Sequence, residues 1–298
     1  MQKDKNKHLK YLVANAADES WGLFITTIGF QSIQANTPYP PKNHPSSYLF
    51  RTEAGRRLNE FQLIYITEGE GVFESTSCEP LKITAGTIIF LFPNEWHTYK
   101  PDKKTGWQEY WIGYKGIFIE NLEKNQFITK KNPVIHVGFH EQIITLFKQG
   151  IEIASMQKPA YQQMLAGITL HMISYISYIH KNNAFRDKGA VLLIEKARML
   201  MRENPEGMDS PKIIADKLNM SYSWFRRTFK HYTGLSPAQY MLEIKIQKSK
   251  ELLIGTNMSI KEIAYVLKFL NVSYFVTFFK AKTGLRPGDY RNQGHSQK

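Results

Sequence analysis

The sequence of 298 residues is poor in cysteine and in long apolar segments. Cys78 is its only cysteine, so no internal disulfide can form. The longest apolar runs, such as 87–93 and 170–179, are well short of the roughly 20 residues that span a bilayer. The first residues are polar and lack the apolar core of a secretory signal. These absences predict a cytoplasmic protein that has no membrane partner.

Sequence patterns of common catalytic sites are missing as well. The chain contains no G-x-S-x-G nucleophile motif, no H-E-x-x-H zinc motif and no phosphate-binding P-loop. We therefore expect no catalytic residues and no enzymatic activity, and we look for a binding function instead.

The formal net charge of +13 is concentrated in the C-terminal part of the chain. Residues 1–180 contain 18 basic and 16 acidic side chains, whereas residues 181–298 contain 21 basic and 10 acidic side chains. A chain of this length exceeds what one hydrophobic core usually serves, so we expect two domains. The basic excess favours a polyanionic partner for the second domain, although a merely soluble basic surface would give the same charge.

The basic part contains an internal repeat of about fifty residues. The first matches have an offset of 49, and the later matches have an offset of 50, so one residue is inserted in the turn of the second copy. At the offset of 49, Ile214, Ala215 and Leu218 match Ile263, Ala264 and Leu267. At the offset of 50, Ser223, Phe225, Phe229, Thr233, Gly234, Leu235, Pro237 and Tyr240 match Ser273, Phe275, Phe279, Thr283, Gly284, Leu285, Pro287 and Tyr290.

The sequence of each copy predicts two short helices joined by a tight turn. Ser210-Pro211 and the capping box from Ser259 to Glu262 mark where the two opening helices begin. In the second helix of the first copy, the three- and four-residue spacing places Tyr222, Phe225 and Phe229 on a buried face. The exposed face then carries polar and basic side chains suited to a DNA groove, although a solvated basic face is the alternative. The expected DNA-binding residues there are Ser221, Ser223, Trp224, Arg226, Arg227 and Lys230.

The corresponding helix of the second copy is much less charged. It points Ser273, Tyr274, Val276 and Thr277 outward, with Lys280 one turn later. Such a face suits thymine methyl groups and phosphates better than guanine edges, and whether it reads bases at all stays open.

Each copy is followed by the pattern F-K-x-x-T-G-L-x-P-x-x-Y, at 229–240 and at 279–290. This doubled motif resembles the DNA-binding domain of the AraC family of bacterial transcription regulators. The resemblance implies two helix-turn-helix units, joined by a linker helix over about 237–253, that bind double-stranded DNA. Three residues depart from the family's pattern: Lys268 stands where a glycine usually ends the helix, Leu270 replaces a polar turn residue, and Lys245 replaces a linker arginine.

The N-terminal part has the pattern of an antiparallel β-barrel or sandwich. Short apolar or alternating runs at 61–67, 71–75, 81–84 and 87–92 are separated by turn residues. The segments Gly69-Glu70-Gly71, Ala85-Gly86, 92–97 and 107–111 resemble the cupin-like ligand-binding domain of sugar-responsive AraC members. The expected fold class is α+β, with a cupin-like β-barrel and flanking helices followed by an all-α DNA-binding domain.

Many cupins are metal enzymes, so a metal-dependent enzyme is the alternative function for this domain. A catalytic cupin needs an H-x-H pair and further ligands that converge on one ion. No histidine occurs from Arg56 to Gly71, and His97 is a lone candidate that is better explained by hydrogen bonding in a core or pocket. We therefore expect no metal and no cofactor. An RNA-binding role would call for stacking aromatics on a sheet, whereas the basic charge lies on predicted helices.

The run from 107 to 111 suggests an effector pocket. Strand alternation places Trp107, Glu109 and Trp111 on one face. Matched to sugar-binding family members, Tyr99, Glu109 and Trp111 fall at pocket positions, and His97 lies close by in the sequence. The resemblance implies a small sugar as effector, because indole faces cover C–H groups and a carboxylate accepts bonds from hydroxyls. Ordinary barrel filling is the alternative interpretation.

Apolar residues at helical spacing predict two amphipathic helices between 139 and 180. These helices either cover the barrel alone or also form the seam of a homodimer, as the family suggests. The expected domains are 1–180 for effector binding and dimerisation, 181–189 as a linker and 190–298 for DNA binding. The resemblance implies a ligand-responsive activator of carbohydrate-utilisation genes that contacts RNA polymerase.

Overall fold

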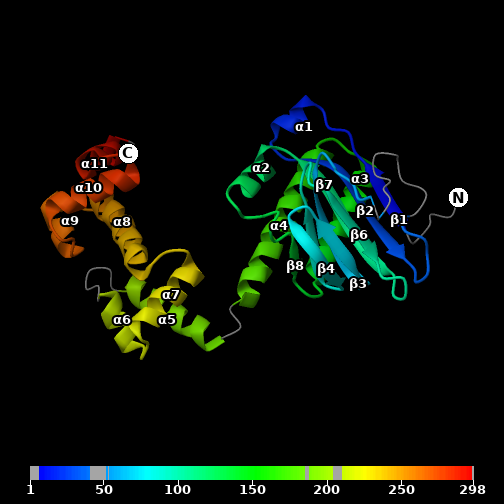
Figure 1. Ribbon diagram of the computed structural model, residues 1–298. Helices are drawn as coiled ribbons and strands as arrows, with labels where there is room; N and C mark the ends of the chain where they lie inside the picture. The colour runs from blue at the N-terminus through cyan, green and yellow to red at the C-terminus, as the bar shows by residue number, and fades with distance from the viewer. Residues whose placement is uncertain (1–6, 41–51, 53, 185–187, 204–209, 297–298) are drawn as a thin grey trace. The chain divides into compact units, whose positions relative to one another are not determined.

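The computed structural model describes residues 7–40, 52, 54–184, 188–203 and 210–296. The chain divides into two compact units, Met1–Ala184 and Phe185–Lys298 (Figure 1). The segment 181–189, predicted to be a linker, is partly helical: helix α4 extends to Ala184 and α5 begins at Lys188, while residues 185–187 lie outside the described part of the chain. No helix among the described residues is long and apolar enough to cross a membrane.

The first unit is built on one curled antiparallel sheet with the strand order β1-β2-β7-β3-β5-β8. Strands β4 and β6 both pair with the far half of β3, which folds the sheet back over itself (Figure 1). The strands are β1 Lys7–Tyr11, β2 Phe24–Ile33, β3 Phe61–Ser75, β4 Cys78–Thr84, β5 Thr87–Leu91, β6 His97–Pro101, β7 Trp107–Lys115 and β8 Val134–His136.

Strand β3 differs from the two separate strands expected at 61–67 and 71–75, because it is continuous over 15 residues. Its first half pairs with β5 and β7 and its second half with β4 and β6. The pairing with β7 shifts register between Ile66 and Glu68, and Gly69 has a φ of +81°. A left-handed residue and a register shift bend a strand without ending it. The predicted turn residues therefore act as a bend.

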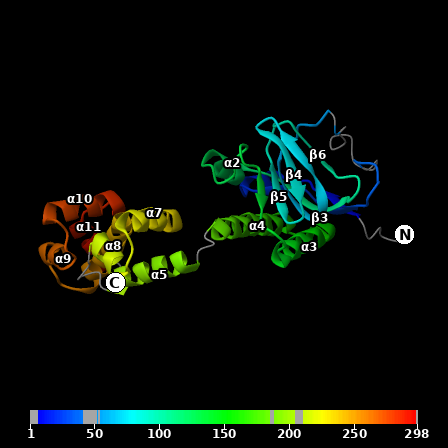
Figure 2. The ribbon, with the colours of Figure 1, turned by 60° about the horizontal axis from the view of Figure 1, so that its bottom comes forward.

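The two faces of the sheet bury different apolar clusters. The outer face, with Ile28, Tyr65 and Ile112, packs against helices α3 Glu141–Met156 and α4 Tyr161–Ala184, which lie side by side beneath it (Figure 2). The predicted helix residues Phe147 and Ile176 are fully buried in this layer. The inner face encloses a second cluster made by Ile33, Leu58, Ile64, Ile66, Phe73, Ile83, Ile89, Leu91, Tyr99, Trp107 and Trp111. Two further helices, α1 Ala16–Ser20 and α2 Ile117–Lys124, complete this unit among the described residues.

The second unit is helical and contains the repeat as two similar helix pairs. The first pair is α6 Pro211–Lys217 and α7 Tyr222–Thr233, and the second is α9 Ile260–Val266 and α10 Val272–Thr283. Three further helices support them: α5 Lys188–Glu203, α8 Pro237–Gly255 and α11 Pro287–Ser296. Each pair has its own core, centred on Phe225 and Phe229 in the first and on Phe275 and Phe279 in the second.

The repeated T-G-L motif ends α7 and α10 in the same way. Gly234 and Gly284 adopt φ values of +79° and +80°, which a glycine accepts without strain. The Thr233 hydroxyl donates to the Phe229 carbonyl at 2.8 Å and accepts from the Leu235 amide at 3.2 Å. Thr283 makes the equivalent bonds. These contacts stop the helix and turn the chain into the next one.

The two departures Lys268 and Lys245 meet at the turn of the second pair. Lys268 has a φ of +49°, which agrees with its place at the position where the family usually has glycine. Asn219 occupies the equivalent place in the first pair and has a φ of +53°. The Lys245 ammonium from α8 donates to the Lys268 carbonyl at 2.9 Å and lies 5.4 Å from the centre of the Phe269 ring. A cation at the end of α9 satisfies a carbonyl that the helix leaves open. Lys245 therefore anchors this turn to the linker helix.

Candidate nucleic-acid interface and effector pocket

Helix α7 presents a continuous basic face to solvent. Ser223, Arg226, Arg227 and Lys230 are all exposed, and no ion pair joins these cations to another described residue. The Ser221 hydroxyl caps the helix by accepting from the Trp224 amide at 3.4 Å. Unpaired guanidinium groups on an exposed helix are suited to phosphates and to guanine edges.

Two residues of α7 lie differently from the sequence prediction. Tyr222 was expected on the buried face with Phe225, but its side chain is 39% exposed. Trp224 was expected to face outward, but it is half-buried and packs against the core of the first helix pair. Tyr222 belongs to the first turn of α7, directly after the cap at Ser221, and Trp224 takes the flank of the buried stripe.

Helix α10 presents a sparser face. Ser273, Tyr274, Thr277 and Lys280 are exposed, as the sequence predicts. Val276 was expected to point outward, but it is half-buried against the core of the second pair. Val276 lies next to the fully buried Phe275, so part of its side chain is covered by the same core. Between Val272 and Phe279, α10 therefore exposes no cation, and its two cations, Lys280 and Lys282, lie in the last turn of the helix.

The inner face of the curled sheet brings the predicted pocket residues together. Tyr99, Trp107 and Trp111 belong to one buried cluster, and the His97 ring stacks on the Tyr99 ring with centroids 6.2 Å apart. Glycines make room for both indoles. A Cβ on Gly29 would lie 2.4 Å from the Trp111 ring, and a Cβ on Gly71 would lie 2.6 Å from the Trp107 ring.

Arg56 is a central residue of this site that the sequence prediction missed. Its Nη2 donates to the Tyr99 hydroxyl at 2.7 Å, and its Nε donates to His97 Nε2 at 3.3 Å. The main chains of Arg56 and His97 also form an isolated β-bridge. Arg56 lies outside the alternating runs on which strand prediction depends, so no local pattern singled it out. A guanidinium therefore stands where the sequence showed only aromatic and acidic candidates.

His97 is a neutral acceptor in this arrangement. Its Nδ1 lies 3.1 Å from the Glu95 carbonyl, which fixes the proton there and leaves Nε2 to accept from Arg56. Burial, and then the charge of Arg56, lower the pKa of His97 to about 3. No group of three His, Cys, Asp or Glu that would hold a metal ion occurs in the described ranges. His97 thus orients Arg56 by a hydrogen bond.

Glu109 is buried with a carboxylate oxygen that has no partner. It is 5% exposed, and Oε2 forms no hydrogen bond with any described residue. Burial raises the pKa of Glu109 to about 8, while the charge of Arg56 and the Trp107 indole N–H act in the opposite direction. A buried and unsatisfied carboxyl is costly unless a ligand completes its hydrogen bonds.

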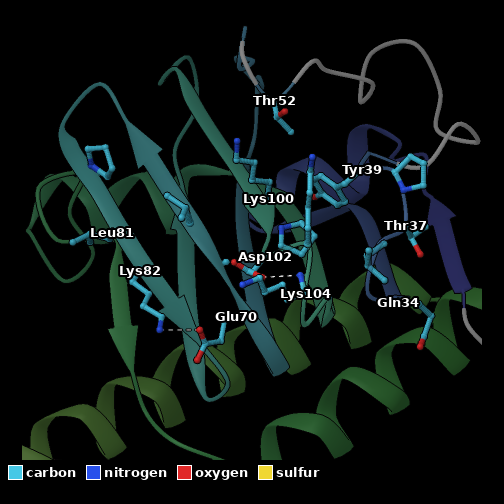
Figure 3. A pocket seen from close by; sticks show the side chains of 18 residues that line it. Gln34, Thr37, Tyr39, Thr52, Glu70, Leu81, Lys82, Lys100, Asp102 and Lys104 are labelled. Atoms are coloured by element: carbon cyan, nitrogen blue, oxygen red, sulfur yellow. Dashed lines mark hydrogen bonds and ion pairs between the residues drawn. The ribbon is translucent and has the colours of Figure 1, made fainter.

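Tyr39 separates this cluster from an open cavity. Its ring centre lies 6.3 Å from that of Tyr99 and 6.1 Å from that of Trp107. On the other side, Tyr39 lines a cavity of about 920 Å³ (Figure 3). Polar side chains around the cavity include Gln34, Thr37, Glu70, Lys82, Lys100, Asp102 and Lys104, with an ion pair of 2.8 Å between Lys82 and Glu70. The volume is within the range of small-molecule sites.

Together, a curled ligand-binding sheet and a doubled helix-turn-helix define a DNA-binding transcription regulator. Family models agree with this class. The AraC-like ligand binding domain matches residues 46–171, and a helix-turn-helix domain matches residues 214–293. The chain belongs to the AraC family of transcription regulators.

Similar proteins are operon regulators. The MmsAB operon regulatory protein of Pseudomonas aeruginosa is 24% identical over 80% of this chain and 76% of its own length. The raffinose operon transcriptional regulatory protein RafR of Pediococcus pentosaceus is 23% identical over 94% of this chain and 96% of its own. The lactose operon transcription activator of Staphylococcus xylosus is 23% identical over 76% of this chain and 82% of its own. These relatives are transcription regulators and not enzymes.

Burial of Glu109 predicts how the first unit responds to pH. The folded carboxyl, with a pKa of about 8, holds a proton that the unfolded one, near 4.5, releases. The folded state then binds more protons over this interval, so its stability falls as the pH rises. Between pH 6.5 and 8, we expect Glu109 to contribute a loss of about 2 kcal/mol that Glu109→Gln abolishes. Deprotonation of unfolded His97, whose ordinary pKa is 6.5, restores about 0.4 kcal/mol in both proteins.

The measurement is urea unfolding followed by tryptophan fluorescence. Four of the five tryptophans, Trp21, Trp96, Trp107 and Trp111, lie in the first unit, so this signal reports chiefly on its unfolding. Glu68→Gln is the matched control, because Glu68 is an exposed carboxylate on the neighbouring strand. An unfolding free energy with the same pH dependence in wild type and Glu109→Gln would contradict the assignment.

Proposed function

We propose that this regulator is a ligand-responsive activator of carbohydrate-utilisation genes. Its first unit binds a small sugar, and its second unit reads an operator. The observation that carries the proposal is the buried carboxyl of Glu109, whose Oε2 has no hydrogen-bond partner among the described residues although it lies among aromatic rings and near Arg56. A carboxyl, a guanidinium and indole faces are the groups with which proteins bind sugar hydroxyls and C–H faces.

Operator recognition is assigned mainly to α7. Ser221, Ser223, Trp224, Arg226, Arg227 and Lys230 form its expected contact surface, and Ser273, Tyr274, Val276, Thr277 and Lys280 form that of α10. The two arginines are exposed and unpaired with described residues, so either can reach guanine O6 and N7 at little cost. Ser221 contributes through its cap, and Trp224 through its half-buried ring. Lys230 and Lys280 are suited to phosphates.

The arginine assignment predicts two separable losses. Loss of a bidentate contact to guanine costs about 1 to 3 kcal/mol and relaxes preference at one base pair. Loss of a phosphate contact weakens binding to all sequences alike and reduces its salt dependence. Arg226→Ala and Arg227→Ala are to be measured by binding to a selected operator at several salt concentrations, with Lys217→Ala on α6 as a control. Unchanged affinity and salt slope in both variants would refute this assignment.

Effector binding is assigned to the inner face of the sheet. Tyr99, Trp107, Glu109 and Trp111 line it, with His97 behind Arg56. The open cavity lined by Tyr39 adjoins these groups, because the Tyr39 ring packs on Tyr99 and Trp107. Two of the relatives are named for raffinose and lactose operons, which supports a carbohydrate as the class of effector.

Glu109→Gln tests the pocket directly. The amide keeps the shape of the side chain but replaces one carboxyl oxygen, which can accept a bond from a sugar hydroxyl, by an NH2 group, which cannot, so we expect at least about a tenfold loss of sugar affinity. The probes are raffinose, lactose and their component monosaccharides, and the readouts are thermal shift and reporter output. Glu68→Gln is again the control. If Glu109→Gln responds like wild type while Trp111→Ala unfolds the first unit, the aromatics are barrel filling instead.

A homodimer is proposed along helix α4. Its apolar face packs on the sheet, but a second stripe stays exposed at alternating three- and four-residue steps: Met164, Gly167, His171, Ser174 and Tyr178. This is the spacing of a helix seam that packs against another helix. Large and small residues alternate along the stripe, which allows close packing with a second copy. Such a dimer would present two DNA-binding units to a repeated operator and to RNA polymerase.

His171→Asp is expected to weaken the dimer. At a symmetric seam the substitution brings two carboxylates together, so we expect the dissociation constant of the dimer to rise about a hundredfold. His180→Asp is the matched control, because His180 is also exposed on α4 but lies on the other side of the helix. Sedimentation equilibrium measures both variants. A monomeric wild type, or equal association of the two variants, would contradict this interface.

A further inference from the structure

The turn between α9 and α10 is one residue longer than the turn between α6 and α7, and the structure identifies the added residue. The Met220 amide donates to the Ala215 carbonyl at 2.9 Å, and the Phe269 amide donates to the Ala264 carbonyl at 3.0 Å. Met220 and Phe269 therefore occupy the same place. In the first pair the helix cap, Ser221, follows at once. In the second pair Leu270 stands between Phe269 and the cap, Asn271.

Leu270 is held out in solvent. Its side chain is 86% exposed, the largest value among the large hydrophobic side chains that the structure describes, whereas Met220 and Phe269 are buried. Leu270 lines an open hollow at the start of α10 together with Tyr265 and Val272, which are also exposed. Apolar area left in water gives up the stabilisation that burial provides. The insertion therefore creates an apolar surface that the fold itself does not use.

This surface is continuous with the face that α10 offers to DNA. A helix-turn-helix places the first residues of its second helix against base edges in the major groove. Leu270 immediately precedes the cap of α10, and Val272 is its first residue. The exposed positions Ser273 and Thr277 bring no guanidinium to this end of the helix. This end of α10 offers bases neutral polar groups and the apolar side chains of Leu270 and Val272, but no cation.

We propose that Leu270 and Val272 contact the 5-methyl groups of thymines, so that α10 reads a thymine-containing half of the operator. The thymine methyl is the one apolar group in the major groove, and contact with it distinguishes T·A from C·G. Helix α7, with Arg226 and Arg227, reads guanine in the other half. Each subunit thus recognises two chemically different half-sites. This inference rests on the DNA-binding function of the second unit and names the chemistry of its second half-site.

Replacing thymine by uracil removes only the methyl group, so it isolates the proposed contact. The operator is first selected from random DNA with the full chain, and thymines in each half are then replaced by deoxyuridine. For wild type, we expect about a fourfold loss of affinity per contacted methyl in the α10 half. Leu270→Ser should bind the thymine operator more weakly by a similar factor and should no longer distinguish it from the uracil operator.

Tyr265→Ser is the matched control, because Tyr265 is as exposed as Leu270 and lines the same hollow but belongs to α9. It should keep the full response to uracil. The proposal is overturned if uracil has no effect on wild type, or if Leu270→Ser retains that effect. The proposal would also be overturned if Leu270→Ser and Tyr265→Ser bound DNA normally but reduced transcription in vitro. That result would indicate that the hollow binds a protein. Failure to select any DNA would instead count against the DNA-reading role.

Discussion

Helix α8 is a member of two hydrophobic cores at once, and DNA reading by the second unit depends on this constraint. Met241, near its start, is buried with Phe225 and Phe229, whereas Ile246 and Leu253 are buried with Phe275 and Phe279. Neither helix pair is large enough to form a substantial core alone. Sharing one rigid helix fixes the distance and rotation between α7 and α10. The polar contact of Lys245 with the Lys268 carbonyl then ties the turn before α10 to the same helix.

The interior of the first unit contains polar side chains whose burial costs free energy of folding. Arg56, His97 and Tyr99 satisfy one another, but Glu109 lies next to them with one oxygen unsatisfied. Ordering a sugar among these groups would return the hydrogen bonds that folding removed from Glu109. Because Tyr39 contacts both Tyr99 and Trp107, such a ligand would also shift the ring that faces the open cavity. The proposed ligand binding and the conformation at the rim of the sheet would thus be coupled through the same few rings.

Most of the architecture could be predicted from the sequence, for identifiable reasons. The repeat, the helix caps and the T-G-L turns are local signals, and the linker helix expected over about 237–253 is α8, Pro237–Gly255. Residues that act through contacts distant in sequence were missed. Arg56 forms a hydrogen bond with His97, which lies 41 residues further along the chain, so no periodic sequence pattern indicates this contact. Continuity of β3 through Gly69 was missed because a glycine bend and a turn look alike locally.

The two helix pairs have the same backbone conformation but expose different side chains. The single inserted residue explains how the second pair keeps the common conformation while its surface differs. Without Leu270, the turn before α10 would match that before α7, and Phe269 would run directly into the cap, as Met220 does. The extra residue leaves Phe269 in its core and adds a side chain outside it. The proposed change of specificity therefore requires no change in the packing that positions α10. A recognition surface of this kind can vary independently of the fold, because the residues that hold the helix in place and those proposed to contact DNA are different.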